Sequence, residues 1–399
     1  MPHFSPEVRR LLTYFAACDS QKPLPRVAVD WTELVEAIQR HRIIGPTYYT
    51  LSQESQSDYP PPTFQRTIQL LHYKNALQTA KMYQNVYRVV DQLAQQDIDF
   101  MIVKGPVLAH TVYPVPAIRY FRDLDFVIRE RDRVQTEKAL SRIGYNIKNG
   151  AINYLPQLTP EVVALRHSQY YNQQIPMPLE VHWENFLVDD MVLRDMESIW
   201  RRATDVSIGD AVVKSPSLED HLIHLCAHAH SHRFEKLFWL SDILLIVRDH
   251  ADKIDWDLFL RTITAEAIEL PVYYSFKLLN ALFDQEVPAE VMNRTRPDRL
   301  RQWFHERFIP EEESHLLSGE DHPPISFKST PFYESTIQNL LVMSRRPEKI
   351  KFLFRLLFPS REWLRYRYNL SAGHRVIPYY FIRLIPPKEV DDLAEDAIL

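Results

Sequence analysis

Glycine is scarce in this chain: only seven of its 399 residues are glycine, where about 7% is usual. The seven are Gly45, Gly105, Gly144, Gly150, Gly209, Gly319 and Gly373. A dinucleotide-binding turn needs three closely spaced glycines, and a P-loop needs a G-x-x-x-x-G-K-[ST] run, because in both the backbone must approach phosphate groups. Neither spacing can be written with these positions. A nucleotide site in this chain would therefore use carboxylates, a metal ion and cationic side chains.

The composition is otherwise that of an ordinary soluble protein, with 45% hydrophobic and 25% charged residues, and the length allows two or three packed units. Two cysteines, Cys18 and Cys226, provide no disulfide framework, and the N-terminus lacks a secretory pattern. The most apolar stretch, Leu237 to Val247, is about half a bilayer span and contains Asp242. We therefore expect a cytoplasmic protein without a membrane span.

The periodicity of apolar residues predicts three regions. Residues 1–97 repeat at three and four positions, which indicates helices; residues 98–215 alternate short apolar runs with helical stretches; residues 216–399 are again helical. The predicted strands are Asp99–Val103, Leu124–Ile128, Gly144–Ile147, Leu179–Trp183 and a hairpin over Val206–Val213. The predicted later helices are Leu218–Val247, Trp256–Phe283 and Ile337–Leu357. The expected fold is mixed α/β (α+β), a small mixed sheet flanked by an N-terminal and a larger C-terminal helical region.

Two acidic residues stand at the beginning of the second predicted strand, in the run Arg119-Tyr120-Phe121-Arg122-Asp123-Leu124-Asp125. Strand side chains alternate, so Asp123 and Asp125 point to the same side. Adjacent carboxylates repel unless a cation lies between them, and Mg²⁺ is commonly held by one or two carboxylates together with substrate phosphates. This pair is a candidate metal site.

Two neighbouring segments strengthen that interpretation. Upstream, an apolar strand ends at Lys104-Gly105-Pro106 and enters a helix, whose free N–H groups can receive a phosphate. Downstream, Leu179–Trp183 supplies a third carboxylate, Glu180, with His182 on the same strand face. From the residues alone, His182 either orients a ligand, acts as a base or is a satisfied buried histidine.

This order of motifs resembles the nucleotidyltransferase superfamily related to polymerase beta, and more closely an uncharacterised bacterial nucleotidyltransferase family. The family's motifs are similar to Val103-Lys104-Gly105, to Arg119 through Asp125, to Glu180-Val181-His182-Trp183, and to a histidine-bearing helix followed by Trp239-Leu240-Ser241-Asp242. The resemblance covers roughly residues 60 to 300.

The resemblance implies a transfer of a nucleoside monophosphate from an NTP, such as ATP, to an acceptor, with release of pyrophosphate. It implies that Asp123, Asp125 and Glu180 are the catalytic, metal-binding acids, with Mg²⁺ or Mn²⁺ as the metal. Lys104, Gly105, Arg119 and His182 would contact the nucleotide, although Arg119 could instead form a salt bridge with Asp123. The acceptor could be a small molecule, an RNA or a protein. One departure is Pro106, where the superfamily has a residue with a backbone N–H.

Two alternative functions rest on other segments. Ser344 to Ile385 carries ten Lys/Arg against two Glu, with many aromatics, and could make the chain a non-catalytic nucleotide- or RNA-binding protein through Arg365 and Arg367. The histidines at 221, 224, 228, 230 and 232 could bind zinc, although they lack the acid of an H-E-x-x-H motif. We also expect Asp242, in an apolar helix, to need a partner when it is buried, for which a histidine of this cluster or Arg248 is the candidate.

Overall fold

The computed structural model describes residues 4–53, 59–147, 167–183, 195–308, 361 and 375–379. It begins with four helices, α1 (Pro6–Ala16), α2 (Trp31–Arg40), α3 (Ile44–Gln53) and α4 (Pro62–Ala94). The first two have side-chain caps: Ser5 accepts a hydrogen bond from the Val8 N–H, and Asp30 accepts from the N–H groups of Thr32 and Glu33. The predicted N-terminal helices are thus present. In the described part of the chain, no helix is long and apolar enough to cross a membrane.

A seven-stranded mixed sheet follows, with strand order β3-β4-β5-β2-β1-β7-β6. Its strands are β1 (Phe100–Val103), β2 (Leu124–Ile128), β3 (Asn146–Ile147), β4 (His167–Tyr171), β5 (Leu179–His182), β6 (Thr204–Ile208) and β7 (Ala211–Ser215). In the centre, β2 pairs antiparallel with β1 and parallel with β5. The mixed α/β class and the β6–β7 hairpin are as predicted. Strand β4 was missed, because its sequence is largely polar.

Both faces of the central strands are covered. Leu124, Phe126 and Val181 belong to a core shared with the second half of α4 and with α6 (Arg133–Arg142). The opposite face places Met101, Val103 and Val127 against Ile199 of α7 (Met196–Arg202). Every residue of β2 is buried. The face that carries Val127 also carries Asp125, because the two are separated by two positions.

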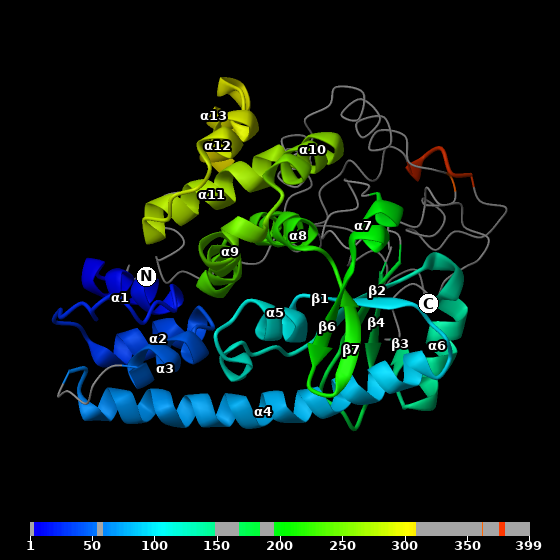
Figure 1. Ribbon diagram of the computed structural model, residues 1–399, viewed down its shortest axis with the longest axis horizontal. Coiled ribbons are helices and arrows are strands. Elements are labelled where there is room, and N and C mark those ends of the chain that lie inside the picture. Colours follow the sequence, from blue (N-terminus) through cyan, green and yellow to red (C-terminus); the bar gives the residue numbers. More distant parts are fainter. Residues whose placement is uncertain are drawn as a thin grey trace.

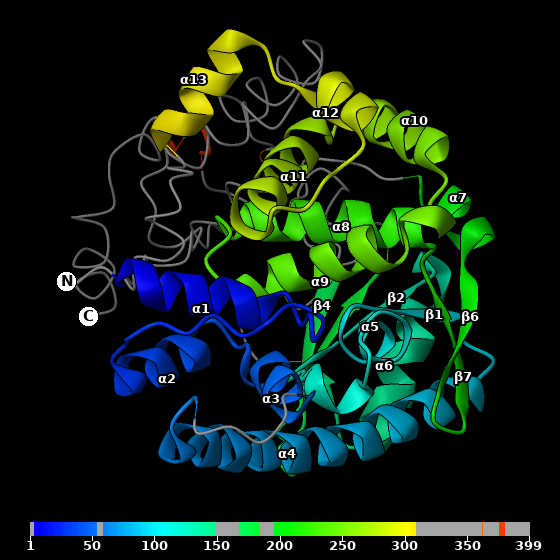
Figure 2. The same cartoon turned by 60° about the vertical axis from the view of Figure 1, so that its left-hand side comes forward.

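The C-terminal helices pack above the sheet and against α1 (Figures 1 and 2). They are α8 (Leu218–Ser231), α9 (Leu237–Asp249), α10 (Trp256–Glu266), α11 (Glu269–Phe283), α12 (Ala289–Thr295) and α13 (Arg299–Phe308). The two long helices predicted here are each divided: left-handed residues Arg233 and Phe234 separate α8 from α9, and left-handed Ala267 separates α10 from α11. The predicted helix Ile337–Leu357 and the basic residues Arg365 and Arg367 lie outside the described residues.

Helix α4 packs against both the helical regions and the sheet. It has 33 residues, about 50 Å at 1.5 Å per residue, and runs beneath both the N-terminal helices and the sheet in the two views (Figures 1 and 2). Its beginning, with Phe64 and Ile68, packs into one core with α1 and with α8 to α11, and its end, with Val89 and Leu93, packs under the sheet. The two helical regions thus share one hydrophobic core.

A close approach connects α3 to the loop before β2. Short 3-10 turns follow α5 (Gly105–Thr111) and β2, at Pro116–Ile118 and Glu130–Asp132, and a third lies at Ala251–Lys253. A Cβ at Gly45 of α3 would overlap the backbone carbonyl of Ile118. Glycine at this position lets helix and loop touch, and the loop leads directly into Arg119.

Candidate active site

Three potential metal ligands meet at the centre of the sheet. The parallel register pairs Asp125 of β2 with Glu180 of β5, and His182 follows two positions later on the same face. One ligand atom from each of these residues lies within 4.8 Å of the others. In the described residues this is the one group of three or more such side chains. Of the acids expected at the site, Asp125 and Glu180 are therefore together, and His182 joins them.

The two carboxyl groups of this site shift in opposite directions from their ordinary pKa values. Burial by itself would raise the pKa of Asp125, but the charge of Lys104 and interactions with His182 and Glu180 hold it below its ordinary value. Burial and the negative charge of Asp125 raise the pKa of Glu180. Two neighbouring carboxyl groups whose negative charges oppose each other in this way have the arrangement that a divalent cation can stabilise.

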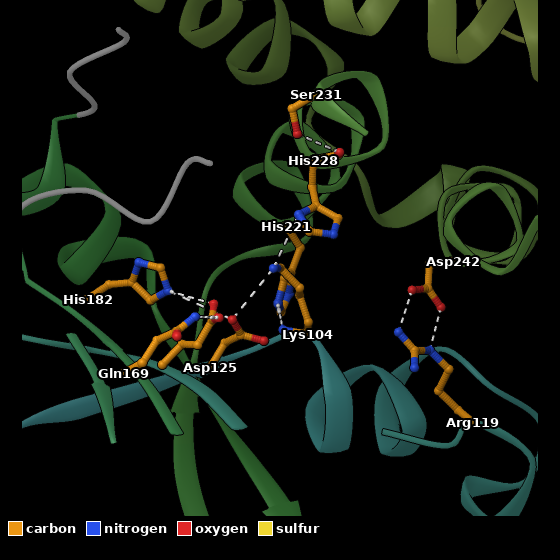
Figure 3. Close-up of polar contacts among 10 residues, drawn as sticks. Lys104, Arg119, Asp125, Gln169, His182, His221, His228, Ser231 and Asp242 are labelled. Atoms are coloured by element: carbon orange, nitrogen blue, oxygen red, sulfur yellow. Dashed lines mark hydrogen bonds and ion pairs between the residues drawn. The ribbon is translucent and has the colours of Figure 1, made fainter. Parts of the chain in front are cut away.

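A glutamine orients the third carboxyl group. Gln169 of β4 lies opposite Glu180 in the antiparallel register, and its Nε2 donates to Glu180 Oε1 at 2.7 Å (Figure 3). This contact fixes one oxygen of Glu180 and leaves the other, Oε2, 4.0 Å from His182 Nε2. Gln169 was not predicted, because only the pairing of β4 with β5 brings it to the site.

Asp123 lies beside this group but is not part of it. It precedes β2, and its side chain is exposed, whereas that of Asp125 is buried. Partial desolvation by the neighbouring atoms and the charge of Asp125 raise the pKa of Asp123, while Lys104 and Arg119 act in the opposite direction. Asp123 thus shares the influence of Lys104 with Asp125, and its assignment as a metal ligand stays a prediction.

Lys104 occupies an uncommon backbone conformation next to the acids. Its φ is +57°, and that of Gly105 is +39°, in the left-handed region that side chains seldom adopt. Its Nζ lies 3.7 Å from Asp125 Oδ1. Pro106 has no N–H, and the N–H of Lys104 is directed at His221. Of these three residues, only Gly105 therefore has a backbone N–H that could bind an anion. The lysine side chain is consequently the turn's main group for an anion.

Two histidines of α8 hold Lys104 in place (Figure 3). The Lys104 backbone N–H donates to His221 Nε2 at 3.4 Å, and Lys104 Nζ lies 3.4 Å from His228 Nδ1. Burial and the nearby lysine charge lower the pKa of His228 well below its ordinary value, so its ring is neutral and can accept from the ammonium group. The periodic histidines of this segment were visible in the sequence, but their lysine partner was not.

Arg119 is placed differently from expectation. Its Nε and Nη2 donate to the two carboxylate oxygens of Asp242, each at 2.7 Å, and Tyr113 Oη donates to the same carboxylate at 2.7 Å. The expected partners of Asp242 were wrong: Arg248 pairs with the adjacent Asp249, and Arg119 occupies the position instead. Figure 3 shows this pair to one side of the acidic group. Arg119 therefore joins α9 to the loop before β2.

The histidine cluster of α8 makes no group of three metal ligands within the described residues. His228 contacts Lys104, and His232 stacks on Trp239 with ring centroids 4.8 Å apart. His230 faces the other way, with its Nε2 2.8 Å from His305 Nε2 of α13. The rings of His228 and His232 lie close together, with centroids 4.6 Å apart, but in the described residues they form no group of three ligands, which gives no support to a zinc site.

Comparison with known proteins agrees with the motifs. A family model described as "Uncharacterised nucleotidyltransferase" matches residues 28–284. A search of curated proteins found no match. Two solved structures are similar in part. One is the lincomycin-bound lincosamide antibiotic adenylyltransferase LnuA, at 16% identity over 35% of this chain and 83% of that chain, with a TM-score of 0.25. The other is the antibiotic-resistance factor ANT(2'')-Ia, at 10% identity over 45% of this chain and 90% of that chain, with a TM-score of 0.33. Similarity at this level carries no information on the acceptor of this chain.

Both ends of the family match lie at ends of helices. It begins just before α2 and ends at Asp284, the residue that follows α11. It therefore includes the acids of β2 and β5, the Lys104 turn, and the helices α8 and α9 that hold Lys104 and Arg119. Because the matched residues make up well over half of the chain, the protein belongs to this uncharacterised nucleotidyltransferase family.

Proposed function

We propose that the protein is a divalent-metal-dependent nucleotidyltransferase that moves a nucleoside monophosphate from an NTP to an acceptor hydroxyl or phosphate oxygen. In this reaction the acceptor oxygen forms a bond to the α-phosphorus, the bond from that phosphorus to the bridging oxygen breaks, and pyrophosphate leaves. A hydroxyl acceptor also gives up its proton, which passes to solvent water. The observation that carries the proposal is the meeting of Asp125, Glu180 and His182 within 4.8 Å, beside Lys104, in a chain of this family.

The donor set suits Mg²⁺ or Mn²⁺. Carboxylate oxygens are the preferred ligands of both ions, and an imidazole nitrogen beside them is more compatible with Mn²⁺ than with Mg²⁺. Asp125 and Glu180 would hold the ion. Asp123 would be a further, exposed acid beside them, and His182 would be either a ligand or the group that orients Glu180. When bound, the ion would lower the pKa of an acceptor hydroxyl and neutralise phosphate charge.

The remaining residues would position the nucleotide. Lys104 Nζ lies 3.7 Å from Asp125, so its ammonium group would meet phosphate oxygens that approach the acids. The N–H of Gly105 would contribute a further hydrogen bond. Arg119 is left out of this set, because its guanidinium edge is bonded to Asp242.

The test is transfer of label from α-³²P-labelled ATP, GTP, CTP and UTP, with Mg²⁺ or Mn²⁺, to candidate small molecules, RNA and protein, together with pyrophosphate release. Activity is expected in the wild type and is expected to be lost in Asp125→Asn and in Asp123→Asn/Asp125→Asn. Asp205→Asn changes an exposed acid that pairs with Lys214 and serves as the matched control. Turnover that survives in the double variant would overturn the site assignment.

A further inference from the structure

A row of aromatic rings continues from Lys104 away from the acids. Lys104 Nζ touches His228 Nδ1 at 3.4 Å, and the His228 ring meets Trp239 edge to face at a centroid distance of 5.5 Å. Trp239 is stacked with His232 at 4.8 Å, with 29° between the ring planes, and the His232 ring also meets His228 edge to face at 4.6 Å. All four side chains are partly exposed. The row therefore leads from the lysine beside the candidate metal ligands to a partly exposed pair of stacked rings.

The chain reversal between α8 and α9 creates this pair. His232 follows the last residue of α8, and left-handed Arg233 and Phe234 turn the chain back so that Trp239, in the first turn of α9, faces His232. His41, in the turn between α2 and α3, accepts the Leu237 N–H at the start of α9. The position of Trp239 is thus fixed by two separate parts of the fold.

The uncharged histidine rings and the nearby cations suit a ligand that has both a neutral aromatic group and a negative charge. Burial, together with the charges of Lys104 and Arg42, lowers the pKa of His232 to about 4, so both histidines of the row are uncharged at neutral pH. Arg42 is an exposed cation whose guanidinium lies over the Phe238 ring, 5.5 Å from its centroid. Two cations, Lys104 and Arg42, are thus within electrostatic reach of the neutral His232 ring.

We propose that Trp239 and His232 form the subsite for the base of the nucleoside triphosphate, with the phosphates at Lys104 and the acids. This inference rests on the proposed function and adds to it the residues that receive the base. Every base has a flat π-face, and stacking on aromatic side chains needs no specific hydrogen bond. The order acid, lysine, aromatic pair matches the order of metal, phosphate and base along a metal-bound nucleotide.

Calorimetric titration of the full chain with ATP and with inorganic tripolyphosphate, each with Mn²⁺, separates the base from the phosphates. Trp239→Ala is expected to bind ATP about tenfold more weakly and to bind tripolyphosphate as the wild type does. Trp239→Phe, which keeps a stacking ring, is expected to restore most of the ATP affinity. GTP, CTP and UTP are titrated in the same way. Trp303→Ala, at an exposed tryptophan of α13, is the matched control and is expected to change neither affinity.

The outcomes that contradict the subsite differ from those that contradict the proposed function. If the wild type binds ATP no more tightly than tripolyphosphate, or if Trp239→Ala weakens both equally or neither, the base does not stack here, although the enzyme can still be a nucleotidyltransferase. If the wild type binds neither ATP, GTP, CTP or UTP nor tripolyphosphate, the proposed function itself fails and the subsite fails with it. Unchanged tripolyphosphate binding in Trp239→Ala also shows that the variant is folded.

Discussion

Arg119 and Asp242 form a buried bidentate salt bridge between the loop that precedes β2 and the middle of α9. Both side chains are less than a tenth exposed, and Tyr113 donates a third hydrogen bond to the carboxylate. Phe238 covers the guanidinium from one side, 5.0 Å from its ring centroid. The pair thus joins two of the motifs that resemble the family, one in the α/β core and one in the helical region.

Removal of one partner of this pair is expected to destabilise the protein strongly. Asp242→Asn should reduce the free energy of unfolding by about 3–5 kcal/mol, because a buried guanidinium loses its charge partner. Arg119→Met/Asp242→Leu should cost less than Asp242→Asn, since no buried charge is left unpaired. Urea unfolding followed by circular dichroism measures both. Glu197→Gln, at an exposed ion pair with Arg129, is the control and should lower the free energy of unfolding by less than about 1 kcal/mol. If Asp242→Asn lowers it by no more than this control, the Arg119–Asp242 pair does not stabilise the fold.

Metal affinity should depend on the acids in a graded way. Asp125→Asn and Glu180→Gln should each weaken Mn²⁺ binding by tenfold or more, because each removes one of the three converging ligands. Loss of a residue that only hydrogen-bonds a metal ligand already lowers metal affinity by about 10–100-fold. Asp123→Asn should have a smaller effect, since Asp123 is outside that group. Electron paramagnetic resonance of free Mn²⁺ measures the affinities, with Asp205→Asn as control. Equal losses in all four variants would show that binding is nonspecific.

His221 should stabilise the strained Lys104 backbone. His221→Ala removes the acceptor of the Lys104 N–H and should lower the free energy of unfolding by about 1–3 kcal/mol. His221→Gln, whose side-chain oxygen can accept the same hydrogen bond, should recover part of this loss. Thermal unfolding of the two variants makes the comparison. If Gln is as destabilising as Ala, the loss comes from packing of the imidazole and not from the hydrogen bond.

Gly45→Ala should be more damaging than its small size suggests. The added methyl group would overlap the Ile118 carbonyl oxygen, and backbone cannot move aside as the end of a side chain can. We expect a loss of about 3 kcal/mol, measured by urea unfolding. Ser52→Ala, on the exposed side of the same helix, should change stability by less than about 0.5 kcal/mol. A mild effect of Gly45→Ala would mean that α3 can separate from this loop without cost.

Stability should fall in mild acid because of buried histidines. Burial lowers the pKa of His41 from 6.5 to about 3. The unfolded chain therefore takes up a proton below pH 6.5 while the folded state does not, so this contribution is complete above pH 6.5 and is lost progressively between pH 6.5 and 3. Each pH unit in that window costs up to ~1.4 kcal/mol for one such group.

His41→Asn tests this assignment. Its amide oxygen can accept the Leu237 N–H that His41 Nδ1 accepts, but it does not titrate. Urea unfolding between pH 7 and pH 4.5 should show a shallower loss of stability for the variant than for the wild type. Parallel profiles would assign the acid sensitivity to other groups, such as His232, whose pKa is lowered to about 4.

The sequence was sufficient for the central strands and for the meeting of Asp125 with Glu180. Their apolar runs are short and bounded, and alternation decides which side each acid faces. Strand β4 escaped prediction because His167-Ser168-Gln169 has no apolar alternation, so its place between β3 and β5 depends on pairing alone. The orienting contact of Gln169 was hidden for the same reason.

The partners of Lys104 and Arg119 could not be predicted because each lies in a distant helix. A buried charge requires a partner, but which of several candidates supplies it depends on how α8 and α9 lie over the sheet. For Asp242 the sequence suggested a histidine or Arg248, whereas the tertiary packing brings Arg119. The prediction that Asp242 is buried and paired was nevertheless correct.

The parallel pairing of β2 with β5 has a consequence for folding kinetics. The two strands are separated by residues 129–178, and closure of so long a segment is slow compared with formation of helices or of the β6–β7 hairpin. Asp125 and Glu180 meet only after this closure. Binding of Mn²⁺ during refolding would therefore report the moment at which the centre of the sheet is completed, later than the gain of helical signal.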